Sequence, residues 1–185
     1  MDPLEDPLRP NAPSTGQASG RASRGLHLWR WVPIRVLKAR HRHRIEQHLL
    51  GLSERDRYLR FGYQASDERI AAYVRSLDFQ RDEIFGIYNR RLQLVAMAHL
   101  AYAQPAGSGP SMTEFAVSVL PYTRGRGYGA RLFAHAVMHA RNRHIEQLMI
   151  HALTENTAML RIAHNAGAVV EHDGVDSEAW LTLPP

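Results

Sequence analysis

Residues 119–130, VLPYTRGRGYGA, place three glycines between a run of strand-forming residues and a long helical pattern. The preceding stretch, TEFAVSVL, is typical of a strand and stops at Pro121. The following stretch repeats apolar residues at helical spacing. The first N–H groups of a helix are unpaired and carry partial positive charge, so a strand that leads through glycines into a helix forms an anion site. A diphosphate is the ligand that such a loop fits best.

The glycine spacing differs from that of two common phosphate-binding loops. Its pattern is G-x-G-x-G, whereas dinucleotide-binding folds use G-x-G-x-x-G. It also lacks the Gly-Lys-Ser/Thr ending of a nucleotide triphosphate loop. On spacing alone, a purely structural turn between strand and helix is the alternative, because glycines also permit unusual backbone dihedrals.

Composition narrows the class of protein. The 185 residues carry a net charge of +5 and contain no cysteine, which excludes disulfides, thiolate catalysis and cysteine-zinc sites. No apolar run approaches the roughly 20 residues of a membrane span. The first residues show neither the basic start nor the apolar centre of a secretory signal. We therefore expect a cytoplasmic protein without a membrane partner, whose basic balance suits an anionic ligand.

Two other kinds of binding site are weaker interpretations. The basic residues 21–44 include tryptophans, as a nucleic-acid arm would, but the chain lacks the aromatic sheet pattern of RNA-binding modules and a DNA-binding helix pair. We therefore do not expect nucleic acid as a partner. His135 and His139 share a helical face with no third ligand in view, so we expect a solvated helix face and no metal.

The chain divides into a tail and one domain. Residues 1–28 are rich in Pro, Gly and Ser and predict a disordered tail; residues 29–185 form the domain. Its patterns predict an α/β (α+β) fold with a mixed, mostly antiparallel central sheet and helices on both faces. The predicted strands are 31–37, 83–89, 92–102, 113–120, 147–153, 168–172 and 178–183, and the predicted helices are 40–52, 66–77, the segment after the glycines to about 143, and 155–167, with 54–63 as a connector.

The segment VSVLPYTRGRGYGARLFAHAVMHA resembles the central motif of the Gcn5-related N-acetyltransferase (GNAT) family. The family pattern Arg/Gln-x-x-Gly-x-Gly/Ala falls here on Arg124, Gly127 and Gly129. Downstream, ENTAMLRIAHNAGA resembles the second family motif, which begins here at Asn156 and has Ala168 where Phe is usual. The short segments RYLRF and EFAVSV look most like the protein-lysine acetyltransferase domains that modify acyl-CoA synthetases.

The resemblance covers about residues 31–183 and implies a GNAT-like fold with acetyl-CoA as cosubstrate. The glycine loop would hold the pyrophosphate through backbone amides. The pantetheine arm would pair with the strand before the loop, from which the strand at 147–152 splays away. Asn156 would bond the arm from the other side, although a simple helix N-cap is its alternative role. The expected cofactor residues are Val117, Val119, Arg124, Gly125, Arg126, Gly127, Tyr128, Gly129, Ala130 and Asn156.

The resemblance also implies direct attack of a primary amine on the thioester. Lysine-type amines are mostly protonated near pH 7, so a group must accept a proton. Glu114 stands where the lysine-modifying relatives carry a base, with a solvated strand end as its alternative role. The position of the family's general-acid Tyr is Ala163, which leaves water, Tyr122 or His164 to protonate the leaving thiolate.

The acceptor and assembly are broader questions. A protein lysine and a small-molecule amine both fit the resemblance as acceptors. Because the general-acid Tyr of the family is missing, a CoA-binding module with little or no turnover is the alternative function. The sequence leaves a homodimer open.

Overall fold

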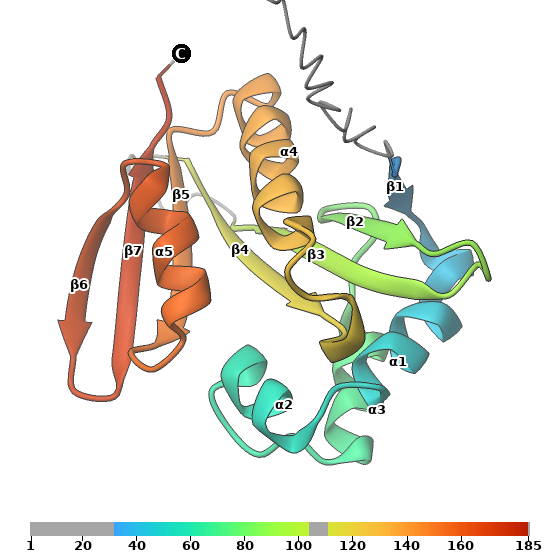
Figure 1. The fold of residues 1–185 in the computed structure, drawn as a ribbon. Coiled ribbons are helices and arrows are strands. Elements are labelled where there is room, and N and C mark those ends of the chain that lie inside the picture. Colours follow the sequence, from blue (N-terminus) through green and yellow to red (C-terminus); the bar gives the residue numbers. More distant parts are fainter. Residues whose placement is uncertain (1–31, 104–110, 185) are drawn as a thin grey trace, which may run out of the picture. The chain divides into compact units, whose positions relative to one another are not determined.

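The computed structural model describes residues 32–103 and 111–184, and the predicted tail at 1–28 lies outside them. Seven strands form one sheet in the order β1-β2-β3-β4-β5-β7-β6 (Figure 1). All neighbouring strands are antiparallel except β4 and β5, which are parallel. The strands are β1 (Ile34–Leu37), β2 (Glu83–Tyr88), β3 (Leu94–Tyr102), β4 (Met112–Val119), β5 (Gln147–Leu153), β6 (Val169–Asp173) and β7 (Asp176–Thr182).

Helices cover both faces of this sheet, as the sequence predicted. Phe115 on β4 stacks edge-on against Phe133 of α4 with ring centroids 5.1 Å apart, whereas Ser118 on the same strand bonds His48 of α1. Side chains an odd number of positions apart in a strand point to opposite faces, so α4 and α1 lie on opposite sides. The helices are α1 (Arg42–Leu50), α2 (Glu54–Phe61), α3 (Asp67–Ser76), α4 (Tyr128–Asn142) and α5 (Thr157–Asn165).

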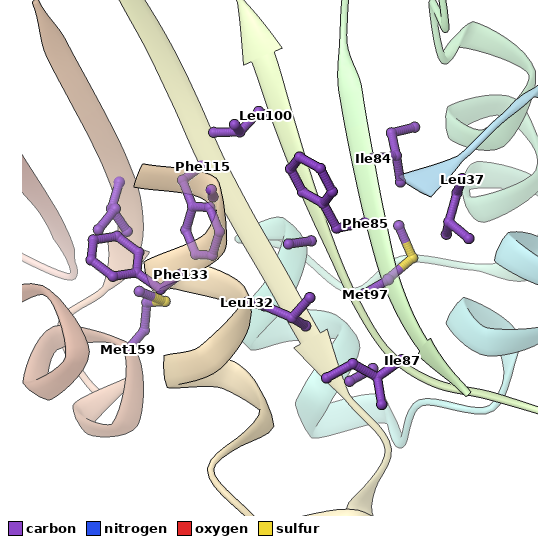
Figure 2. Packing of buried hydrophobic residues seen from close by; sticks show 14 of the residues in the cluster. Leu37, Ile84, Phe85, Ile87, Met97, Leu100, Phe115, Leu132, Phe133 and Met159 are labelled. Carbon is purple, nitrogen blue, oxygen red and sulfur yellow. The ribbon is translucent and has the colours of Figure 1, made fainter. Parts of the chain in front are cut away.

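The core lies between the sheet and its helices (Figure 2). Six residues of α4 form the apolar stripe expected from the helical spacing after the glycines; four of them are buried, and the other two are partly buried against the core. Burial of a large apolar side chain contributes about 1.5–3 kcal/mol, so this stripe anchors α4 firmly. The buried four are Leu132, Phe133, Ala136 and Ala140, and the partly buried two are Tyr128 and Val137.

The prediction of a connector at 54–63 is wrong, because α2 occupies most of that stretch. Ser53 caps this helix, its hydroxyl accepting from the amide of Asp56 at 3.2 Å, and Gly62 ends it in the left-handed conformation at φ 78°. The guanidinium of Arg57 donates to the carbonyls of Leu50 (2.9 Å) and Ala65 (3.1 Å). These hydrogen bonds from Arg57 to the segments on either side therefore help to hold the helix in place.

The helix predicted at 66–77 is confirmed as α3, capped by Ser66 through its bond from the amide of Arg69. Over the described ranges, none of the helices is both long and apolar enough to cross a membrane.

Candidate cofactor and acceptor site

The two central strands separate after a short paired segment. Met112, Thr113 and Glu114 of β4 face Gln147, Leu148 and Met149 of β5. Past these pairs no further β4–β5 pairing is present in the described chain, although both strands continue. Figure 1 shows the two strands diverging from that point. The predicted splay of the strand at 147–152 is therefore confirmed.

The backbone of β4 directs alternate residues into this opening. The amide of Leu120 donates to the carbonyl of Val95 on the β3 side at 2.9 Å, whereas the amide of Gln147 on β5 donates to the carbonyl of Ser111 at 3.1 Å. Hydrogen-bonding groups of successive strand residues point to opposite sides. The odd-numbered residues therefore point towards β5, which places the N–H and C=O groups of Val117 and Val119 at the opening.

The glycine loop joins β4 to the N-terminus of α4. Gly125 (φ 74°) and Gly127 (φ 72°) adopt the left-handed conformation that side chains disfavour, and a Cβ on either would meet nothing within 4 Å. The first helical bond runs from the amide of Arg131 to the carbonyl of Gly127 at 3.0 Å. The amides of 128–130 precede it and have no partner within the helix.

Gly129 allows close packing rather than an unusual backbone conformation. Its φ is not positive, but a Cβ there would lie 3.3 Å from Cδ1 of Ile162 on α5. The first turn of α4 contains no acidic residue, so nothing on the helix opposes the positive end of its dipole. Tyr128 and Gly129 are half-buried, whereas Arg126 and Ala130 are exposed. The loop thus offers unpaired amides on an open surface.

The side chain of Arg124 is committed to an ion pair. Its guanidinium pairs with the carboxylate of Asp56 on α2, which also accepts from the hydroxyl of Ser53 at 2.6 Å. This pair ties α2 to the glycine loop. Arg124 therefore lies in the loop as predicted, while its charge is shared with Asp56.

Glu114 lies where the β4–β5 pairing ends. It faces Ala101 on β3 and Met149 on β5, and its side chain is exposed. It shares the α1 face of the sheet with Ser118, since the two are four positions apart. Glu114 thus stands at the apex of the opening, on the side away from α4.

Asn156 is the N-cap of α5. Its Oδ1 accepts from the amide of Met159 at 3.2 Å, which matches the alternative role derived from the sequence. Ala163, at the position of the missing Tyr, is fully buried. Tyr122 and His164 are both exposed.

The prediction of a solvated face for His135 and His139 is wrong. Both rings pack on Phe85, with centroids 4.7 and 4.6 Å from its own, and His139 Nδ1 lies 3.4 Å from the carboxylate of Glu83. Burial lowers the pKa of His135, and the neighbouring His139 lowers it further. Among the described residues, no three His, Cys, Asp or Glu side chains gather as metal ligands.

Two buried histidines on the Glu114 face escaped sequence reasoning. His48 is bonded to the carbonyl of Leu94 (2.9 Å) and the hydroxyl of Ser118 (2.8 Å), and burial lowers its pKa to about 4. His99 lies between Asp82 (3.0 Å) and Tyr73 (2.8 Å). Their partners come from separate elements, so no local pattern marks them.

The sequence and the fold are similar to those of known acetyltransferases. Residues 40–168 match the model of the acetyltransferase (GNAT) family, which is more than half of the chain. No curated protein sequence matches. Solved structures share the fold at low sequence identity. The GNAT domain of S. lividans PAT superposes with a TM-score of 0.68 at 19% identity, over 81% of this chain and 89% of that one.

Two ligand-bound structures are also similar. The putative acetyltransferase yncA from Salmonella typhimurium, solved with acetyl-CoA, gives a TM-score of 0.64 at 15% identity over 84% and 95% of the two chains. The spermidine N-acetyltransferase from Vibrio cholerae, in complex with CoA and spermine, gives 0.63 at 14% identity over 82% and 95%. The family match, the strand opening and the glycine loop agree, and the chain belongs to the acetyltransferase (GNAT) family.

Proposed function

We propose that this protein transfers an acetyl group from acetyl-CoA to a primary amine, with both substrates bound together. The observation that carries the proposal is the opening between β4 and β5, next to a helix N-terminus with unpaired amides. A thioester arm needs strand-like hydrogen bonds and a diphosphate needs donors. The chain provides both at adjacent positions.

The residues present fit acetyl-CoA. Amides of 126–130 would bond the pyrophosphate, where the left-handed glycines leave the surface free of side chains. Val117 and Val119 would bond the pantetheine arm through backbone groups directed at the opening. An amide near Val119 would also polarise the thioester carbonyl. The side-chain NH2 group of Asn156 would bond the pantetheine arm from the other side, while its Oδ1 caps α5.

Acetyl-CoA supplies an activated acetyl thioester, from which the amine nitrogen takes the acetyl group while CoA leaves with the sulfur. Glu114 is the proposed proton acceptor for the amine. It is exposed at the apex of the opening, so an amine arriving from the α1 face reaches it without crossing the sheet. Because Ala163 is buried and carries no acid, the departing thiolate would take its proton from water.

The acceptor class of this proposal covers a protein lysine and a small-molecule amine. The resemblance of RYLRF and EFAVSV to protein-lysine acetyltransferase domains supports the first. The likeness of fold to the spermidine N-acetyltransferase in complex with CoA and spermine supports the second. The test is thiol release from acetyl-CoA by the full chain with a panel of both acceptor types. Release with at least one amine supports transfer. Cofactor binding without release from any amine would favour a CoA-binding module.

A further inference from the structure

A hydrogen-bonded chain with a buried inner end crosses the side of the sheet that carries Glu114. Asp82, just before β2, accepts from His99 on β3 at 3.0 Å, and His99 Nδ1 lies 2.8 Å from the hydroxyl of Tyr73 on α3. That hydroxyl also accepts from the guanidinium of Arg60 on α2 at 3.0 Å. Asp82 and His99 are both buried. Residues of α2, α3, β3 and the segment before β2 thus form one line of polar groups.

The hydrogen positions along this chain follow from the charge of Asp82. Burial acts to raise the pKa of Asp82, but hydrogen bonds from Arg81 and His99 outweigh it and hold the pKa below its usual value. A carboxylate only accepts, so His99 donates from Nε2. Nδ1 of the neutral ring then accepts from Tyr73, whose oxygen accepts from Arg60. Each hydrogen bond is therefore donated in the direction from Arg60 towards Asp82. The guanidinium of Arg60 forms the outer end of the chain.

Arg60 is connected to the face of β3 that carries His99 through the hydroxyl of Tyr73. Its Cζ is 5.0 Å from the ring centroid of Phe61 and 5.5 Å from that of Tyr73. Burial lowers the pKa values of both His48 and His99, and the charge of Arg60 lowers both further. The charge of Glu114 acts on His99 in the opposite direction. His99 faces Ala116 on β4, two positions from Glu114 on the same face, so the line of hydrogen bonds that starts at Arg60 passes beside Glu114.

A carboxylate alone would be a poor environment for an attacking amine. A nearby negative charge stabilises the ammonium form, which has no lone pair for attack, and a nearby positive charge disfavours it. We propose that Arg60 is a fixed cation of the acceptor site, and that its charge favours the neutral form of the amine. This inference rests on the proposed function. Tyr73, His99 and Asp82 are the positioning residues that hold this cation there.

The pH dependence of acetyl transfer tests the role of Arg60. Thiol release is measured between pH 6 and 10 at saturating acetyl-CoA, with one active acceptor and the full chain. With the acceptor also saturating, Arg60→Gln should move the alkaline rise of kcat, which reports the bound amine, upward by about one pH unit and lower kcat near pH 7 about tenfold. Arg60→Lys keeps the charge and should keep the profile. Arg69→Gln is the matched control, because this exposed arginine also stacks on a ring, that of Tyr63.

The positioning chain is tested by Tyr73→Phe and His99→Gln. Each should shift the profile in the same direction as Arg60→Gln but less, because the guanidinium stays charged and loses its fixed place. The acetyl-CoA-induced rise in melting temperature should stay normal in all variants. An unchanged profile in Arg60→Gln overturns the proposal. It is equally overturned if Arg60→Lys shifts as far as Arg60→Gln, or if neither chain variant moves the profile.

A second readout does not depend on activity. Histidine NMR of the acetyl-CoA-free protein, with the His99 signal assigned through His99→Gln, should show a higher pKa for His99 in Arg60→Gln and no change in Arg69→Gln. If no amine gives thiol release, the proposed function fails while this readout still locates the cation. If Arg60→Gln leaves the His99 titration unchanged, Arg60 does not act on this face and the inference fails by itself.

Discussion

Glu114 on β4 and Met149 on β5 are the last facing pair before the two strands part. Up to this pair the strands share a ladder, and after it the backbone of β4 lacks a neighbour on that side among the described residues. The position of Glu114 is therefore fixed by the sheet, while its side chain is exposed. A fixed backbone position with an exposed carboxylate suits the role of proton acceptor that we propose for Glu114.

Glu114→Gln should remove basicity while keeping size and polarity. Turnover should fall by roughly 100- to 10,000-fold, as is typical of a lost general base, with cofactor binding nearly unchanged. The deficit should shrink at high pH, where more of the amine is already neutral. Thiol release as a function of pH measures this, with Glu171→Gln on β6, another exposed strand glutamate, as the matched control. Wild-type turnover at neutral pH with saturating acceptor would remove Glu114 from the mechanism.

Gly129→Val should disturb the diphosphate site, because its branched methyls would crowd Ile162 and displace the first turn of α4, whose amides would hold the diphosphate. Gly129 has no positive φ, and the only neighbour of an added Cβ is the end of the Ile162 side chain, so the fold should persist. The rise in melting temperature with acetyl-CoA should largely disappear, since a ligand stabilises only what it binds. Ala134→Val, at an exposed position of the same helix, should keep the full rise. A normal rise in Gly129→Val would make the loop a structural turn only.

Val119→Pro tests the backbone contact proposed for the cofactor arm. The amide of Val119 points to the opening rather than to β3, so proline removes this donor and leaves the β3 ladder in place. We expect weaker acetyl-CoA binding by calorimetry with a modest loss of stability. Ala116→Pro instead removes a ladder donor and should destabilise the domain strongly. Equal cofactor affinity in Val119→Pro and wild type would contradict the role of this amide.

His48 should make the domain less stable in acid. Its pKa is about 4 in the folded protein against 6.5 for an unburied imidazole. The unfolded chain therefore binds more protons between these values, so stability is fully present above pH 6.5 and is lost as the pH falls towards 4. The loss is about 3 kcal/mol. Urea unfolding at pH 4, 5.5 and 7 measures it, and His48→Gln should flatten this pH dependence. A wild-type slope in that variant would assign the acid sensitivity to other groups.

Local sequence patterns determined most of the elements. The Ser66 cap and apolar spacing of α3, the hairpin of β2 and β3, and the left-handed Gly167 after α5 are all read from neighbouring residues. The glycine loop is equally local, because an anion site at a helix N-terminus needs only the order of strand, glycines and helix. The cofactor residues and Glu114 came from that loop and from the family resemblance, and their roles stay predictions.

Tertiary structure decided what local patterns do not encode. Helix α2 is held in place by bonds to residues further along the chain, such as the ion pair of Asp56 with Arg124 and the hydrogen bond from Arg60 to Tyr73. His135 and His139 were wrongly predicted to be solvated, because the packing of Phe85 on α4 depends on the register of the sheet.

The line from Arg60 through Tyr73 and His99 to Asp82 joins α2, α3, β3 and the start of β2. In sequence these residues are isolated polar positions. Only the antiparallel register of the sheet and the packing of α2 and α3 bring them within hydrogen-bond distance. Most helices and strands are determined by residues that are neighbours in sequence. The polar groups at this site are distant in sequence, and only the packing of the sheet and its helices brings them together.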